Sequence, residues 1–152
     1  MKTFKEIVET FESACDANLV VNTFQYGTID KLDASTQNVS YPYVFLRNVT
    51  SPGLVLNANG VSGTRTLTFE LYSLDVPKLT ESDYLDVMSD CENTIYDIVS
   101  YFNNGADQQD SYITLVNIAP VNEAFQDRVY GFVATINYTE EGILDFCNYP
   151  SA

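Results

Sequence analysis

The chain has 152 residues, 45% of them hydrophobic, and 21 acidic residues against 7 basic ones give it a net charge of −14. This length and apolar content predict one domain with its own core and exclude a disordered tail. The charge excludes a protein that grips a nucleic-acid backbone, because such binding needs Lys and Arg to replace counterions. An acidic wall past which DNA merely slides is still compatible with it.

The first predicted element is a helix over residues 2–17, where apolar residues recur at helical spacing. The stripe consists of Phe4, Ile7, Val8, Phe11, Ala14 and Cys15. The charged start "MKTFKEIVETFESACDAN" lacks the apolar core of a signal peptide, so no targeting segment is expected. No run approaches the length of a membrane span, so no membrane contact is expected either.

Several strands are predicted between this helix and the middle of the chain. Residues 19–27 form a strand ending at Gly27, and a polar loop follows over 28–40. A second strand covers 41–50, where Pro42 suits a strand start or an edge. Within the following loop, 51–63, the stretch "LVLNA" has room to pair briefly.

The clearest strand is "TRTLTFELYSLDV" at 64–76, because apolar and polar residues alternate along it. Leu67, Phe69 and Leu71 are expected on one face. Thr66, Thr68, Glu70 and Tyr72 are expected on the other.

A long central helix is predicted next, with Thr80 as its N-cap and "NNG" at 103–105 as its end. Its apolar stripe is formed by Tyr84, Met88, Cys91, Ile95, Ile98 and Phe102, and Leu85 and Val99 widen it. A stripe of this length is sufficient to cover a sheet of four or five strands.

Two further strands are predicted over 111–121 and 128–139, joined by a turn at 123–127. Strands thus cluster before and after one helix instead of alternating with helices. This order predicts an α+β fold: a mostly antiparallel sheet with an N-terminal helix and one long central helix packed on one face, in a single domain over 1–152.

The residues offer little catalytic chemistry. The chain has no His, which excludes Ser-His-Asp and Cys-His catalysis and removes the commonest metal ligand. Its acidic residues are interpreted as a solvated surface, and "DQQDS" does not have the spacing of an EF-hand loop. Three separated Cys residues indicate buried thiols in a reducing compartment. We therefore predict no catalytic residue, no cofactor and no metal.

Arginine is rare in this acidic chain, and Arg47, Arg65 and Arg128 each lie in or beside a predicted strand. A guanidinium group in this setting pairs with a carboxylate, either within the fold or across a subunit boundary. The loops 27–40 and 51–63 are long for a small domain, and long loops of this kind order against partner chains or simply cover the surface.

Three stretches carry a resemblance to a known family: "YPYVFLRNV" (41–49), "GTRTLTFELYSLDVP" (63–77) and "NEAFQDRVYGFVATINY" (122–138). With the order of N-terminal helix, extended pair, central helix and final hairpin, the chain resembles the tail-terminator and head–tail connector proteins of tailed bacteriophages. It is most similar to small neck proteins like those of crAss-like phages. The likeness covers most of the chain and consists of strand patterns.

The resemblance implies a non-enzymatic virion protein, assembled in the host cytoplasm, that forms a homo-oligomeric ring in the neck or at the head-proximal end of the tail. DNA passes through the ring without specific binding, and other neck, portal or tail proteins are its partners. Arg128 or Tyr130 then helps to set the sheet edge or the subunit contact, as do Arg47 and Arg65. A closed ring needs two different faces of each subunit to meet.

Two alternatives stay open at this point. One is a phage tail-tube or baseplate subunit with a related fold. The other is a small non-phage α+β domain that binds a ligand or acts as an enzyme, which requires a concave pocket with convergent polar groups.

Overall fold

The computed structural model describes residues 2–28, 30–32, 39–49, 53–58, 60, 62–77, 81–105, 111–124 and 129–143. Among the described residues, 30–32 are helical, and two longer helices and six strands have defined bounds. They are α1 (Phe4–Ala17), β1 (Thr23–Tyr26), β2 (Tyr43–Asn48), β3 (Gly53–Leu56), β4 (Ser62–Asp75), α3 (Glu81–Asn104), β5 (Ser111–Ala124) and β6 (Val129–Ile143).

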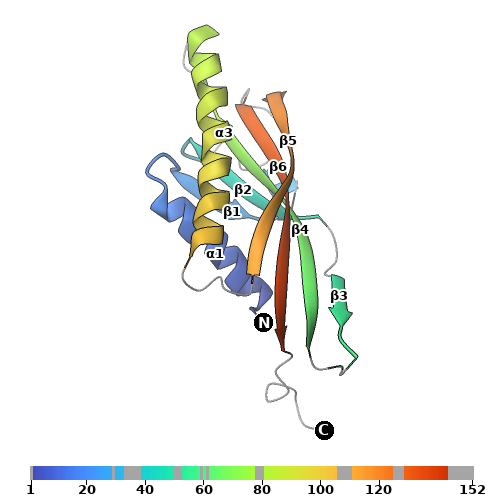
Figure 1. Cartoon of the computed structure of the whole chain (residues 1–152). Coiled ribbons are helices and arrows are strands. Elements are labelled where there is room, and N and C mark those ends of the chain that lie inside the picture. Colours follow the sequence, from blue (N-terminus) through green and yellow to red (C-terminus); the bar gives the residue numbers. More distant parts are fainter. Residues whose placement is uncertain are drawn as a thin grey trace.

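The strands form one six-stranded sheet in the order β1-β2-β4-β6-β5, and β3 pairs with β4 beside β2. Only β1 and β2 run parallel; the other pairs are antiparallel. Both helices cover the same face of the sheet (Figure 1). This confirms the predicted α+β class with its mostly antiparallel sheet, N-terminal helix and central helix.

Helix α1 begins where its sequence provides a complete capping box. The Thr3 hydroxyl accepts the Glu6 N–H at 3.2 Å, and the Glu6 carboxylate accepts the Thr3 N–H at 2.6 Å. The buried residues Ile7, Phe11, Ala14 and Cys15 all belong to the predicted stripe. Ring packing of Phe11 against Phe69 and Phe102 ties α1 to both the sheet and α3.

Helix α3 ends at Asn104, as predicted, and buries Cys91, Ile95, Ile98 and Phe102. The prediction that Leu85 widens the stripe is wrong, because this side chain is 67% exposed. The first turns of α3 reach beyond the strands (Figure 1), so a side chain off the central line of the stripe has no sheet beneath it there.

Strand β4 alternates as predicted. Leu67, Phe69 and Leu71 are buried under the helices, while Thr66 and Thr68 lie on the opposite face and are only partly covered. At its far end that opposite face carries a second, smaller core. Its buried members are Leu32, Tyr43, Phe45, Leu74 and Val129.

Gly131 lies on β6 opposite Leu74 of β4. Its φ of +154° is a conformation that L side chains rarely adopt, and a Cβ there would collide with the Ser73 carbonyl. Only glycine fits this position, which explains the Gly between two aromatic residues in "RVYGF".

Two predictions for residues 19–40 differ from the structure. The strand predicted over 19–27 covers only Thr23–Tyr26, and Leu19 lies in a turn with 99% of its side chain exposed. Within the loop predicted over 28–40, Leu32 is fully buried in the smaller core. The brief pairing expected for "LVLNA" is confirmed as β3. The predicted N-cap Thr80, most of the turn at 123–127 and the whole 106–110 loop lie outside the described residues.

Among the described residues, no helix combines the length and the apolar character that crossing a membrane requires.

Candidate functional site

The four predicted interface residues do not form one cluster. Arg47 lies on the sheet face that the helices leave uncovered, where its Nη2 is 2.7 Å from Glu70 Oε2 across the β2–β4 pair. The Tyr72 hydroxyl donates to the same carboxylate oxygen at 2.9 Å. Burial, and this bond to Glu70, raise the pKa of Tyr72 to about 12. Arg47 is therefore paired within its own chain.

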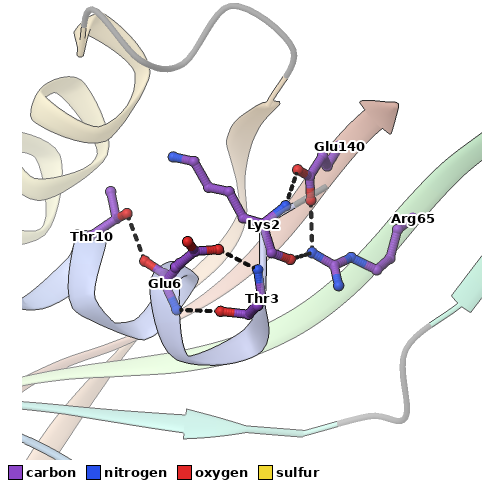
Figure 2. Close-up of polar contacts among 6 residues, drawn as sticks. All are labelled: Lys2, Thr3, Glu6, Thr10, Arg65 and Glu140. Atoms are coloured by element: carbon purple, nitrogen blue, oxygen red, sulfur yellow. Dashed lines mark hydrogen bonds and ion pairs between the residues drawn. The ribbon is translucent and has the colours of Figure 1, made fainter. Parts of the chain in front are cut away.

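Arg65 lies on the helix-covered face and pairs with Glu140 on β6 at 2.7 Å. The other oxygen of Glu140 accepts the backbone N–H of Lys2 at 2.7 Å, and Arg65 also donates to the Lys2 carbonyl (Figure 2). Glu140 is 4% exposed, so this carboxylate is buried with its charge partner and two hydrogen bonds. The group fixes the chain just before α1 to the β4–β6 pair.

Tyr130 packs edge-to-face against Tyr84 of α3, with 4.8 Å between the ring centroids. This contact joins the start of β6 to the first turn of α3 within the chain. Arg128 lies outside the described residues. An interface role for these four residues stays a prediction.

The most exposed apolar strand is β3. At the end of the sheet that contains Arg65 and Glu140, β3 pairs with the first residues of β4, which pair in turn with the last residues of β6. We call these segments, Gly53–Leu56, Ser62–Thr66 and Thr139–Ile143, the arm; it projects past the N-terminus of α1 (Figure 1). Leu54, Val55 and Leu56 are 46%, 72% and 45% exposed. Such a run on a sheet edge is a template for pairing with another chain.

The opposite edge of the sheet, β5, is covered in three ways. The Asn103 side chain donates to the Ile113 carbonyl at 2.9 Å and accepts the Ile113 N–H at 2.8 Å. Register shifts interrupt the strand between Leu115 and Asn117 and between Val121 and Ala124. Pro120 has no N–H to offer. These are devices that prevent edge-to-edge pairing.

A hollow of about 350 Å³ lies where the end of α1 meets the C-terminal part of α3. Ala14, Ala17, Leu19, Val20 and Tyr101 line it, with Asp97 and Asn18 as its polar members. Leu19, Val20 and Tyr101 are all exposed. A lining this apolar suits contact with another protein surface better than it suits a catalytic centre, which needs convergent polar groups.

The reactive side chains that sequence reasoning considered are placed in inert settings. Burial raises the pKa of the Cys15 and Cys91 thiols to about 12, so neither is a thiolate near neutral pH. Among the described residues, no three His, Cys, Asp or Glu side chains gather into a metal site. Cys147 lies outside that part of the chain.

Sequence reasoning missed the residues that define the two edges. Leu54, Val55 and Leu56 were expected to pair only briefly in a loop, although an uncharged apolar run in so acidic a chain is a signal that could have drawn attention to this edge. Nothing in the local sequence indicates that Asn103 covers β5. No family model matches the chain, and no curated protein is found to be similar to it.

Proposed function

We propose that this protein is a structural virion subunit that assembles into a ring in the neck of a tailed phage, or at the head-proximal end of its tail. In this role it joins head and tail around the channel through which DNA passes. Its partners are other copies of itself and the neighbouring neck, portal or tail proteins.

The observation that carries this proposal is the arm. A chain with a net charge of −14 presents an uncharged, apolar strand on an open sheet edge, where Val55 alone is 72% exposed. Exposed apolar strands are aggregation hazards unless a partner covers them. The arm is thus best explained as a surface that another protein subunit covers.

The hollow between α1 and α3 supports the same proposal. It is an apolar surface on the helical layer, whereas the arm extends the sheet (Figure 1). A ring needs two unlike surfaces on each subunit, and the hollow, which is separate from the arm, is one candidate for them.

The distribution of charge also supports a DNA channel. The 24 residues of α3 include six acidic side chains and no Lys or Arg. A wall of this kind repels phosphate, which is useful in a channel that DNA must traverse without binding.

The test is to measure the mass of the purified protein by light scattering and to image it by negative-stain microscopy, alone and with tail tubes. Closed annular particles, formed alone or on the end of a tube, are expected. Open tubes would instead favour the tail-tube alternative. A protein that stays monomeric and does not bind tubes or portals would contradict the proposal.

A matched pair of variants sharpens this test. Leu19→Ser removes an apolar side chain that is 99% exposed, so it should reduce ring formation without lowering thermal stability. Leu85→Ser, on an exposed part of α3 away from the hollow, serves as the control.

A further inference from the structure

We propose that two copies of this protein pair arm to arm through β3, so that an antiparallel sheet continues from one chain into the other across a two-fold axis at Val55. The inference rests on the proposal that the arm is a protein contact, and it names the partner: β3 of a second copy.

The other sheet edges are poor partners for β3. Asn103 occupies both backbone groups of Ile113 on β5. On β1, the Lys31 ammonium group donates to the Tyr26 carbonyl at 2.9 Å. Within the described part of the chain, β3 lies at an edge where no such cover is seen, so a second β3 offers the best-matched unpaired strand.

The backbone of β3 has the alternation that this pairing needs. Asn57 donates its N–H to the Ser62 carbonyl at 2.8 Å, so the N–H of Asn57 faces β4. Two residues earlier, Val55 does the same, and a Cβ on Gly63 would collide with the Val55 carbonyl. Leu54 and Leu56 therefore turn their N–H and C=O groups away from β4, toward an incoming strand.

The side chains select one register. Leu54 and Leu56 pair with Arg65 and Gly63, which places them on the helix-covered face, while Val55 pairs with Thr64 and lies on the other face. With the axis at Val55, Leu54 lies opposite Leu56 of the partner subunit. The backbone N–H and C=O groups of these two residues then form hydrogen bonds with each other. The two Val55 side chains then meet as a pair without hydrogen bonds, the closer kind. All three exposed apolar side chains gain an apolar neighbour.

Charge favours a copy of the same chain over a basic partner. Residues 53–58 carry no charge, so a cationic partner finds nothing to pair with there. Two acidic chains that meet at this uncharged strip avoid placing carboxylates opposite each other. Their overall repulsion is screened by salt, so pairing should strengthen as salt is raised.

A two-fold contact closes with two copies, so it does not itself build a ring, which needs unlike surfaces. It joins two free subunits, or it joins two rings end to end. Its size, one short strand from each chain, places it among weak and reversible contacts.

Disulfide trapping tests the register directly. In a Cys147→Ser background, in which Cys15 and Cys91 are buried, V55C should form covalent dimers under mild oxidation at least tenfold faster than L54C or L56C alone. The three sites are neighbours on one exposed strand, so differences in folding do not explain such a result. Equal yields from the three variants would overturn the proposed register.

Sedimentation tests the contact without cross-linking. V55D places a charge at the axis and should weaken dimerisation at least tenfold, whereas Ala58→Asp adds the same charge at the arm's turn and should change it less than twofold. A wild-type chain that is monomeric at about 1 mM in high salt, or a V55D chain that associates like wild type, would overturn the inference. If the V55C protein formed rings but no cross-linked dimers, only this inference would be contradicted. If it formed cross-linked dimers but no rings, only the proposed ring would be contradicted.

Discussion

Two edge strands of this sheet, β5 and β3, differ in how they are protected from pairing with another chain. Strand β5 is covered by the Asn103 side chain and interrupted by Pro120 and two register shifts. Strand β3 presents three exposed apolar residues and no charge. An edge is left open when pairing is useful and closed when it is harmful. The difference is the reason for proposing that the molecule associates at the arm and not at β5.

Both edges adjoin the antiparallel β4–β6 pair, which we call the spine. In this pair Ser62 lies opposite Ile143 at one end, and Asp75 lies opposite Tyr130 at the other. Changes in the spine should disturb both edges, whereas changes at one edge should leave the other unaltered. This separation organises the predictions that follow.

The largest effect is expected in the spine. Gly131→Ala should lower the free energy of unfolding by about 4 kcal/mol, since strain at a positive φ and overpacking each contribute roughly 1–3 kcal/mol. Its Cβ would collide with the Ser73 carbonyl. Urea unfolding followed by circular dichroism measures this loss. The control is Gly53→Ala, whose new Cβ has only an ordinary contact at 3.8 Å; equal losses in the two variants would contradict the account.

The second largest effect is expected at the Arg65–Glu140 ion pair, which lies within the arm. Glu140→Ala removes the partner of the partly buried Arg65 and releases the Lys2 N–H, so we expect a loss of about 3 kcal/mol. Because the same group fixes the chain before α1, amide exchange at residues 2–6 should also accelerate. Glu141→Ala, an exposed neighbour on the same strand, should change stability by less than about 0.5 kcal/mol. A Glu140→Ala protein as stable as that control would show that the ion pair does not anchor the arm.

Much of this fold follows from local patterns in the sequence. The capping box at Thr3 and the spacing of Ile7 and Phe11 specify α1, and the alternation of Leu67 and Phe69 specifies the faces of β4. These features depend on residues a few positions apart, where period and capping act.

The candidate site depends instead on residues distant in sequence, and for that reason it could not be predicted. Arg65 and Glu140 are 75 positions apart, and no spacing rule joins them. Asn103 was predicted to help end α3, yet its amide also pairs with Ile113 on β5. The exposure of Leu19 and Leu85 likewise depends on where the sheet ends, which tertiary packing decides.

The cover on β5 provides the third prediction. Asn103→Ala removes two hydrogen bonds to Ile113 and should lower the free energy of unfolding by about 2 kcal/mol, at roughly 1 kcal/mol for each bond. It also opens a second edge, so the variant should aggregate at protein concentrations where wild type does not.

The control for this prediction is the adjacent Asn104→Ala, whose amide donates to the exposed Ser100 hydroxyl at 3.2 Å. Light scattering of both variants, each with and without V55D, distinguishes association through β5 from association through β3. New association through β5 should persist when V55D blocks the arm. If V55D abolished it, the uncovered β5 edge would not be the cause.

The smallest effect near neutral pH is the change of stability with pH that the buried thiol and phenol groups cause. It distinguishes the buried interior from the exposed arm. Burial raises the pKa of Cys15, Cys91 and Tyr72 to about 12, above their ordinary values of 9.0 for Cys and 10.0 for Tyr. The unfolded chain therefore releases these protons first, so the stability that these three groups contribute is retained below their unfolded pKa values and is lost as pH rises from about 9 toward 12. Urea midpoints at pH 8, 9, 10 and 11 measure the fall.

In a Cys147→Ser background at pH 8, the cysteine of V55C should react with a thiol reagent at the rate of a free cysteine, because Val55 is 72% exposed. Cys15 and Cys91 should react only after unfolding. Rapid labelling of those two in the folded protein would mean that the helices do not seal the sheet face, and the contrast between a closed interior and one open edge would be lost.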